Sequence, residues 1–340
     1  MKKIKLFVVN SGTFGKFTTV IDELEKLCEI SKVSVQRDID GYELAEKLKG
    51  ANFIVASSNP HYTNEFFEKN KDVIAILVHG IGVDNIDLNS ATKNGVIITR
   101  VPGPVEREAV AMLTIALILD ALRYVFQSVN KVKEGKWEER IKYIGSELTG
   151  KTIGIIGVGN IGSRVAEILS KAFNVKVIAY DPYITEDKVK DLNVELVNLD
   201  TLLQNSDIIT LHTALTKETY HMLNDYTFKK IKKGAILVNT ARGALIETEA
   251  LLRAIDNGTL SAVALDVIEN EPISKDHPIL KYDNVIVTPH IGAYTFEALR
   301  GMDYSIFNAI KALLECRVPE TIVNKEVLQN ENLRLKIFIG

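Results

Sequence analysis

A short strand-like run that ends in closely spaced glycines constrains the fold of this chain more than any other feature. The run 152–156 is followed by Gly157, Gly159 and Gly162. Such a segment turns tightly at the first glycine, exposes backbone at the second and packs a helix closely against a sheet at the third. The helix is indicated by apolar residues at helical spacing, namely Ile161, Val165, Ile168, Leu169 and Phe173. The sequence therefore predicts a strand–turn–helix unit whose N-terminal amides can bind phosphate groups.

An acidic residue at the end of the next apolar run indicates which dinucleotide this unit binds. Asp181 follows the run 175–180 and stands nineteen residues after Gly162. In a dinucleotide-binding unit, an acid at this spacing accepts hydrogen bonds from the ribose diol of adenosine. A 2′-phosphate would instead meet the negative charge of Asp181. The sequence therefore predicts a site for NAD rather than for NADP.

Composition excludes several classes of function. The chain has 340 residues, of which 46% are hydrophobic, so it can bury the cores of two domains. Its 41 basic and 44 acidic residues give a net charge of −3 without a basic block, so we expect neither nucleic acid nor a membrane as partner. The first ten residues alternate like a strand rather than a signal peptide, and no apolar run has the length of a membrane span. We expect a soluble, cytoplasmic protein.

The cysteines and histidines give no sign of a metal centre. Cys28 and Cys316 are the two cysteines, and each is expected on an amphipathic helix as a core residue. None of the six histidines stands at metal-ligand spacing from another ligand. We therefore expect no metal.

Strand-like runs alternate with helical periodicity from the start, which predicts parallel β-α-β units. In the first unit, strands are expected at 3–9, 33–36, 52–56, 73–77 and 96–99, and helices near 18–29, 41–49, 62–69 and 87–94. The sequence Pro102-Gly103-Pro104 then breaks the chain, and a single long helix is expected over 105–133.

A second unit carries the glycine-rich segment. Its strands are expected at 152–156, 176–180, 194–198, 207–211, 235–239, 260–265 and 284–287, and a long helix over 295–316 should return to the first unit. We predict an α/β fold of two doubly wound parallel sheets, a flavodoxin-like domain (1–101 plus 296–340) and a Rossmann NAD-binding domain (102–295). Ligands of such sheets bind beyond the carboxyl ends of the strands, so an interdomain cleft is the expected site.

Three polar residues stand at the ends of apolar strands in the second unit: Arg242, Glu271 and His290. Hydride transfer between a nicotinamide and a 2-hydroxy acid needs a fixed cation for the carboxylate and a group that exchanges a proton with the oxygen. A guanidinium forks onto a carboxylate, and an imidazole titrates near neutral pH. A carboxylate beside the imidazole fixes its tautomer and favours its protonated form. The chemistry therefore assigns the cation to Arg242, the proton exchange to His290 and the supporting carboxylate to Glu271.

Over nearly its whole length the chain resembles the D-isomer-specific 2-hydroxyacid dehydrogenases. The resemblance rests on six segments: Gly82-Val83-Asp84-Asn85-Ile86-Asp87, Leu148-Thr149-Gly150-Lys151-Thr152, Tyr180-Asp181-Pro182, Asn239-Thr240-Ala241-Arg242-Gly243, Leu265-Asp266-Val267 with Glu271-Pro272, and Thr288-Pro289-His290-Ile291-Gly292. It implies the catalytic roles just given to Arg242, Glu271 and His290. It also implies that the first domain binds the substrate and that the protein is a homodimer, with the long helix after Pro104 in the interface.

The resemblance also implies ligand contacts residue by residue. Around NAD it places Gly157, Gly159, Asn160, Ile161 and Asp181. Toward the nicotinamide half it brings His212, Thr213, Thr240, Ala241, Asp266 and Gly292, several of them through backbone atoms. Backbone amides near Ile81 and Gly82 resemble the family's contacts with the substrate carboxylate.

Departures from the family pattern leave the substrate open. Ala214 and Met112 stand where proline and an acid are usual, at positions that are not catalytic. Arg100 replaces a common asparagine, and Arg107 lies near a one-residue length difference, so both can reshape the substrate pocket. Glu271 stands where related formate dehydrogenases have glutamine, which favours hydroxy-acid chemistry.

Two other functions stay open beside a small 2-hydroxy-acid dehydrogenase. The first is a D-3-phosphoglycerate dehydrogenase, with phosphate contacts from Arg100, Arg107, His79 or His61. The chain lacks the C-terminal regulatory extension of the serine-inhibited type, so we expect a form without that domain. The second is an NAD-sensing scaffold, since the wider family includes corepressors that bind proteins.

Overall fold

The computed structural model of the chain describes residues 4–335, which form two compact units. Unit 1 consists of residues up to 106 and from 294 onward, and unit 2 consists of residues 107–293. Residue 3 of the predicted strand 3–9 and the outermost residues of the predicted first domain lie outside the described part.

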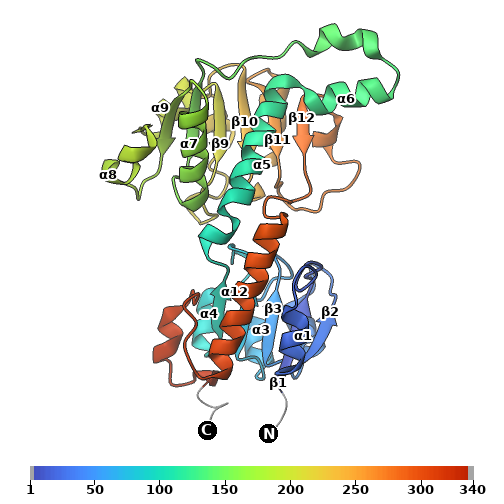
Figure 1. The fold of residues 1–340 in the computed structure, drawn as a ribbon, viewed down its shortest axis with the longest axis vertical. Helices are drawn as coiled ribbons and strands as arrows, with labels where there is room; N and C mark the ends of the chain where they lie inside the picture. The colour runs from blue at the N-terminus through green and yellow to red at the C-terminus, as the bar shows by residue number, and fades with distance from the viewer. Residues whose placement is uncertain (1–3, 336–340) are drawn as a thin grey trace. The chain divides into compact units, whose positions relative to one another are not determined.

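Unit 1 is built on a five-stranded parallel sheet with the order β2-β1-β3-β4-β5, which is the flavodoxin-like order. Its strands are β1 (Ile4–Val9), β2 (Cys28–Val33), β3 (Phe53–Ala56), β4 (Ala75–Val78) and β5 (Ile97–Arg100). Alternate strand residues face opposite sides, so two separate cores form. One face packs against α1 (Val20–Glu25) and α12 (Phe296–Leu314), and the other against α2 (Gly41–Lys47), α3 (Asn64–Lys69) and α4 (Leu88–Lys93) (Figure 1).

The first helix lies within its predicted range of 18–29, but its predicted end and the predicted second strand are wrong. Helix α1 ends at Glu25, and the second strand occupies 28–33 rather than 33–36. Cys28 pairs with Ile4 and Val33 with Val9, so the pairing with β1 decides the structure of a segment whose mixed polar sequence gives no clear strand pattern. Cys28 is buried as expected, but on a strand. Cys316 lies just beyond α12 and is exposed, so its predicted core position is also wrong.

Unit 2 contains a seven-stranded parallel sheet with the order β12-β11-β10-β9-β6-β7-β8. Its strands are β6 (Thr152–Ile156), β7 (Lys176–Tyr180), β8 (Val194–Leu196), β9 (Ile208–Leu211), β10 (Ala235–Asn239), β11 (Leu260–Leu265) and β12 (Val285–Val287). The order reverses at β6, as it does in Rossmann sheets. The predicted fold class of two doubly wound parallel sheets is therefore confirmed.

Helices cover both faces of the second sheet (Figure 1). One face packs against α5 (Gly103–Arg123) and α7 (Asn160–Ala172), and the other against α9 (Leu199–Asn205), α10 (Asp225–Phe228) and α11 (Thr248–Asp256). The shorter elements are α8 (Glu186–Val189) and the 3-10 turns η1 (Trp137–Tyr143), η2 (Lys190–Leu192), η3 (Gly243–Leu245), η4 (Pro278–Lys281) and η5 (Lys325–Gln329).

The helix predicted over 105–133 is two helices. Helix α5 ends at Arg123, Tyr124 takes a left-handed conformation with φ 53°, and α6 (Val125–Lys133) continues at an angle of 64°. The Asp120 carboxylate accepts a hydrogen bond from the N–H of Phe126 at 2.8 Å and so caps the second helix. In the described part of the chain, no single helix is long and apolar enough to cross a membrane, and α5 and α6 pass that test only when joined across the bend.

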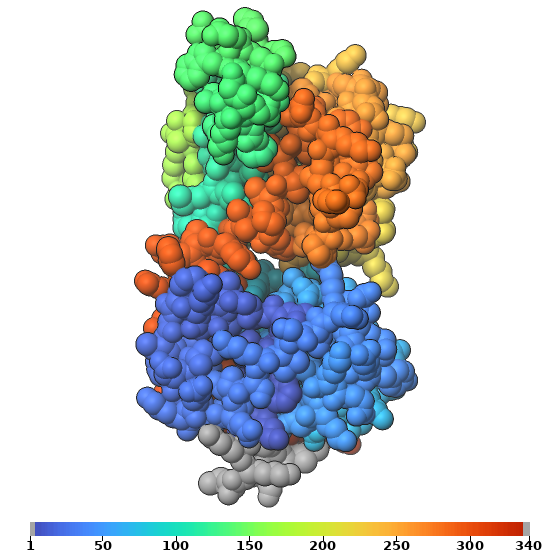
Figure 2. All heavy atoms as spheres, turned by 90° about the vertical axis from the view of Figure 1, so that its right-hand side faces the viewer, coloured from blue at the N-terminus to red at the C-terminus, as the bar shows by residue number. Residues whose placement is uncertain are grey.

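Helix α6 and the turn η1 form an arm, residues 125–144, that extends from the body of unit 2 (Figure 1). Neither element contains a buried residue. The arm exposes large apolar side chains. Trp137, the largest of them, keeps 63% of its surface exposed. The others are Val125, Phe126, Val129, Val132, Ile141 and Ile144. In Figure 2 the arm stands out as a raised green lobe.

Candidate functional site

The three glycines after β6 have different structural reasons to be glycine. Gly157 has φ 93°, and a Cβ there would lie 2.8 Å from the carbonyl carbon of His212. A Cβ at Gly162 would lie 1.9 Å from the carbonyl oxygen of Gly157, because α7 packs directly on the turn. A Cβ at Gly159 would meet nothing within 4 Å. Folding therefore requires glycine at 157 and 162, whereas the open space at 159 fits close approach by a ligand.

The surroundings of this turn fit a dinucleotide. Helix α7 begins at Asn160 without a side-chain cap, so its first amide groups are available to phosphates. Asp181 follows β7, and its Oδ2 accepts a hydrogen bond from the N–H of Val158 at 2.9 Å. Its Oδ1 accepts another from the N–H of Tyr183 at 3.0 Å. The carboxylate thus lies beside the glycine turn.

His212 follows β9 and lies under the same turn. Its Nε2 is 3.0 Å from the hydroxyl of Thr210, and its Nδ1 is buried with no hydrogen-bond partner among the described residues. Burial lowers the pKa of His212 to about 3, so the ring is neutral at physiological pH. Gly157, Gly162 and His212 are therefore one packed group, with Thr213 next to them in the chain.

The loop that carries Arg242 is fixed by a buried asparagine. The Asn239 side chain, fully buried at the end of β10, donates to the carbonyl of Arg242 at 2.8 Å and accepts from the N–H of Ala241 at 3.0 Å. The hydroxyl of Thr240 lies 2.8 Å from that of Thr114 on α5. The Arg242 guanidinium donates to the carbonyl of Ala241 at 2.7 Å. The cation therefore stands on a rigid strand end.

Glu271 and His290 are brought together, although they follow different strands. The Nδ1 of His290 is 2.5 Å from Oε1 of Glu271, and Oε2 of Glu271 accepts from the N–H of Ile268 at 3.3 Å. The two side chains keep 38% and 23% of their surface exposed, so a ligand can reach the ring. Because Nδ1 faces the carboxylate, Nε2 on the opposite side of the ring is placed to exchange a proton.

Asp266 holds the turn that presents His290. Its buried carboxylate accepts hydrogen bonds from the Thr288 hydroxyl at 2.6 Å, the Ile291 N–H at 2.8 Å and the Gly292 N–H at 2.7 Å. Its carbonyl accepts from the N–H of His290 at 2.9 Å. These bonds stabilise the left-handed conformation of His290, whose φ is 54°. Sequence reasoning gave Asp266 only a place toward the nicotinamide and missed this role.

In unit 1, Ile81 and Gly82 follow β4 and are partly exposed. Asn85 is buried and donates to the carbonyls of Ser57 and Pro60, which joins two loops at the carboxyl edge of this sheet. Ile81 and Gly82 thus stand in a loop that a buried hydrogen-bond network holds in place.

The residues left without a role have different surroundings. His61 is exposed, and Arg100 is exposed at the end of β5. Arg107 lies 3.6 Å from Glu167 of α7 in unit 2. His79 is buried, with its Nε2 3.0 Å from Asp303 of α12. Among the described residues, no group of three His, Cys, Asp or Glu side chains is close enough to hold a metal ion.

Sequence reasoning quoted Asn239 only as part of a family segment, without a role, and did not single out Asp303. A polar residue that ends an otherwise apolar strand was the available signal for Asn239. For Asp303 the signal was an acid within an apolar helical pattern, but nothing in the sequence identified His79 as its partner, 224 residues away.

Comparison with known proteins identifies relatives over most of the chain. Residues 115–292 match the family model described as "D-isomer specific 2-hydroxyacid dehydrogenase, NAD binding domain". The chain is 40% identical over 320 residues to a D-3-phosphoglycerate dehydrogenase of Methanocaldococcus jannaschii, covering 94% of this chain and 60% of that protein. It is 38% identical over 291 residues to a glyoxylate reductase of Thermofilum pendens, covering 84% of this chain and 85% of that protein.

The lengths of these relatives differ from that of this chain. It spans only 60%, 50% and 49% of three D-3-phosphoglycerate dehydrogenases. Among solved structures, D-lactate dehydrogenase from Aquifex aeolicus, in complex with NAD and lactic acid, matches with a TM-score of 0.83 and 30% identity. That match covers 94% of this chain and 99% of the other.

Proposed function

The chain belongs to the D-isomer-specific 2-hydroxyacid dehydrogenase family, and from this premise we propose that it is an NAD-dependent oxidoreductase. It interconverts a small 2-oxo acid and the corresponding D-2-hydroxy acid. The observation that carries the proposal is the 2.5 Å contact between His290 and Glu271 at neighbouring strand ends of the NAD-binding unit.

NAD, when bound, supplies the hydride carrier of this chemistry. The residues proposed to hold it through the glycine turn are Gly157, Gly159, Asn160, Ile161, Gly162 and Asp181. Those proposed near the nicotinamide are His212, Thr213, Thr240, Ala241, Asp266 and Gly292. Both sets of residues follow strands of one parallel sheet, and the carboxyl ends of parallel strands lie along the same edge of the sheet.

The protein side of the reaction is assigned to three side chains. Arg242 binds the substrate carboxylate and polarises the ketone, since a guanidinium stays charged and forks onto a carboxylate. His290 donates the proton that the developing alkoxide requires, through Nε2. Glu271 holds Nδ1 of His290 and so fixes the tautomer and the ring orientation. Backbone amides of Ile81 and Gly82 are proposed as further ligands of the carboxylate.

A phosphorylated substrate is the second candidate function. The observation that favours it is the 40% identity to a D-3-phosphoglycerate dehydrogenase across 94% of this chain. Arg100 is the cation proposed to contact the phosphate, since it is exposed at the carboxyl end of β5. Arg107 is a weaker choice because its guanidinium lies near Glu167.

We also propose that the protein works as a homodimer through the exposed arm, residues 125–144. Exposed apolar side chains on the arm, with Trp137 the largest, form the kind of surface that a second copy of the chain covers. Gln127 anchors the arm to unit 2 by donating to the carbonyl of Asp283 at 3.1 Å.

The experiment that tests the function is an initial-rate assay of NADH oxidation. The panel contains glyoxylate, hydroxypyruvate, pyruvate, a branched 2-oxo acid and 3-phosphohydroxypyruvate, each repeated with NADPH. We expect turnover with at least one acid and a preference for NADH, set by Asp181. Preference for 3-phosphohydroxypyruvate would select the second candidate. Tight NADH binding without turnover of any acid would contradict the enzyme and favour an NAD-sensing scaffold.

A further inference from the structure

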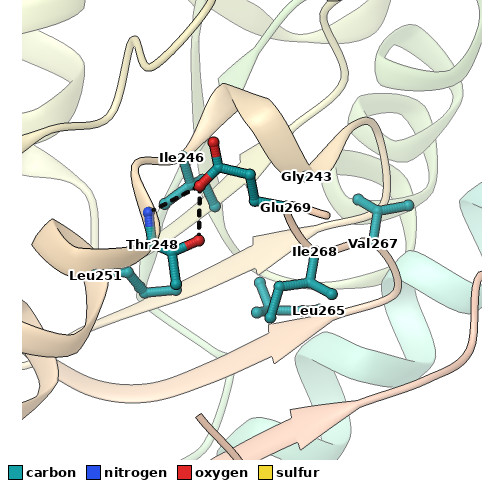
Figure 3. A pocket seen from close by; sticks show the side chains of 8 residues that line it. All are labelled: Gly243, Ile246, Thr248, Leu251, Leu265, Val267, Ile268 and Glu269. Atoms are coloured by element: carbon teal, nitrogen blue, oxygen red, sulfur yellow. Dashed lines mark hydrogen bonds between the residues drawn. The ribbon is translucent and has the colours of Figure 1, made fainter. Parts of the chain in front are cut away.

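A second histidine–carboxylate pair lies in unit 2, outside the residues given roles above. The Nε2 of His221 is 2.5 Å from Oε1 of Glu269, and the two side chains keep only 26% and 17% of their surface exposed. The other oxygen of Glu269 accepts hydrogen bonds from the hydroxyl of Thr248 at 2.8 Å and from its N–H at 3.3 Å. Figure 3 shows the Glu269 side chain directed at Thr248. Both carboxylate oxygens are therefore engaged.

The surroundings keep Glu269 ionised. Burial by itself would raise the pKa of its carboxyl, but the hydrogen bonds from His221 and Thr248 outweigh burial and hold the pKa below its ordinary value. Thr248 is also the first residue of α11, so the negative charge lies at the positive end of that helix.

His221 is held as firmly as its partner. It has a left-handed backbone with φ 50°, and its N–H donates to the carbonyl of Ala244 at 2.9 Å. Its ring stacks on Tyr220, with 3.9 Å between ring centroids. Leu223 pairs in parallel with Ile246. Backbone contacts therefore hold the segment 220–223 against the residues that follow Arg242 in the sequence.

The turn after Arg242 presses on the backbone beside Glu269. A Cβ added to Gly243 would lie 2.1 Å from the carbonyl carbon of Ile268 and 2.4 Å from the nitrogen of Glu269, so no side chain fits there. The cavity beneath these residues, drawn in Figure 3, has a volume of about 10 Å³. That volume holds at most one water molecule, so the network belongs to the framework rather than to a ligand site.

Glu269 stands two residues before Glu271 in the loop after β11. Ile268, the residue that precedes Glu269, is hydrogen-bonded to Glu271. The N–H of Ile268 donates to the side chain of Glu271, and the N–H of Glu271 donates to the carbonyl of Ile268, both at 3.3 Å. We propose that Glu269, held by His221 and Thr248, is a positioning residue. It fixes this loop so that Glu271 stands against His290, and it joins the loop to the turn that carries Arg242. The inference rests on the proposed function.

A double-mutant cycle tests whether Glu269 acts through Glu271. The variants are Glu269→Ala, Glu271→Gln and the double variant, compared in kcat for reduction of the best 2-oxo acid and in KM for NADH. We expect Glu269→Ala to lower kcat by on the order of tenfold to a hundredfold, since a displaced catalytic group costs that much. The KM for NADH should stay within about twofold of the unmodified protein. In the Glu271→Gln background the same substitution should change kcat little. Full additivity of the two effects would overturn the proposal.

A matched control separates positioning from general destabilisation. Asp225 also bonds to α11, through Arg253 at 2.9 and 2.8 Å, but on the exposed surface. Asp225→Asn should keep the kcat of the unmodified protein. If Glu269→Ala does not fold, His221→Asn replaces it, because asparagine tolerates positive φ and is too short to keep the contact with Glu269. A kcat unchanged in His221→Asn would equally contradict the proposal.

Crystal structures of the unmodified protein and Glu269→Ala give a readout that does not need turnover. We expect the separation of Glu271 Oε1 and His290 Nδ1 to grow by more than about 0.5 Å, the tolerance within which catalytic groups must be held. An unchanged separation would overturn the inference even in an active enzyme. Absence of turnover in the unmodified protein, together with an increased separation in the variant, would instead contradict the proposed function and leave the positioning role standing.

Discussion

Nε2 of His79 lies 3.0 Å from Oδ1 of Asp303, and both side chains are almost wholly buried in unit 1. The same carboxylate accepts hydrogen bonds from the N–H of Gly15 at 3.1 Å and the hydroxyl of Thr18 at 2.7 Å. The other ring nitrogen of His79 is 3.3 Å from the hydroxyl of Ser11. One buried acid of α12 therefore joins the loop after β1 to the end of β4.

Removing this acid should destabilise the protein strongly. Asp303→Ala leaves Nε2 of the buried His79 and the donors of Gly15 and Thr18 without their acceptor, so we expect the free energy of unfolding to fall by about 3–5 kcal/mol. Asp303→Asn keeps part of the hydrogen bonding and should cost about 1–3 kcal/mol. Urea unfolding measures both, with Glu43→Gln, an exposed ion-pair residue, as the control. An effect of Asp303→Ala no larger than the control's would show that the network does not stabilise unit 1.

Alanine at two glycines of the turn after β6 should have opposite consequences. At Gly159 a methyl group meets no atom of the protein, so the variant should unfold like the unmodified protein but bind NADH at least tenfold more weakly. At Gly162 the methyl group collides with the Gly157 carbonyl, so stability itself should fall. Thermal unfolding without cofactor and fluorescence titration with NADH separate the two cases. Unweakened NADH binding by Gly159→Ala would argue against pyrophosphate at this turn.

His290→Asn is a conservative test of proton exchange. Asparagine tolerates the left-handed backbone of this position, so the turn held by Asp266 should remain. We expect kcat to fall by about 10²-fold or more, because general acid–base catalysis contributes 10²–10⁴-fold, while NADH affinity stays the same. Steady-state rates and NADH titration measure the two quantities. Near-normal turnover would remove His290 from the mechanism.

The neutral His212 predicts how stability depends on pH in the absence of cofactor. Its pKa is lowered from 6.5 to about 3 in the folded protein, so between these values the unfolded chain binds a proton that the native state does not. The free energy of unfolding should therefore decrease as pH falls below 6.5, by at most about 1.4 kcal/mol per pH unit from this group. Urea unfolding between pH 7 and 4 should show a shallower decrease in His212→Gln. Identical slopes would contradict burial of this ring.

Substitutions on the exposed arm should change the state of association. Trp137→Ser and Phe126→Ser change side chains that are more than half exposed, in two elements that contain no buried residue, so folding should be unaffected. We expect a dimer for the unmodified protein and monomers for the double variant, measured by sedimentation velocity. Tyr183→Ser, which removes another exposed aromatic ring at a distant position in the sequence, serves as the control. A monomeric unmodified protein would contradict the arm as a dimer interface.

The sequence predicted β6, β7, β10 and β11 to the residue because their apolar runs are bounded by turns and buried on both faces. It was wrong within residues 18–36 and at Tyr124. In residues 18–36, the pairing of an edge strand with β1 overrides the local sequence pattern. At Tyr124, the cap that Asp120 provides for the second helix overrides it. The first error comes from pairing with a distant segment, whereas Asp120 lies near Phe126 in the sequence but its hydrogen bond leaves no mark in the apolar periodicity.

The candidate site shows the same limit. Arg242, Glu271 and His290 could be proposed from the sequence because titratable residues at strand ends are typical of catalytic sites. The contacts around them could not be predicted: Asn239 fixes the Arg242 loop and Glu269 borders the Glu271 loop, each through contacts made only in the folded chain. Spacing in a sequence suggests candidate reacting groups more readily than the residues that support them.

The buried side chain of Asn239 binds the backbone of its loop. Asp266 does the same for the backbone amides of residues 291 and 292. Mutation can therefore replace the side chains that these loops display while the loops keep their course.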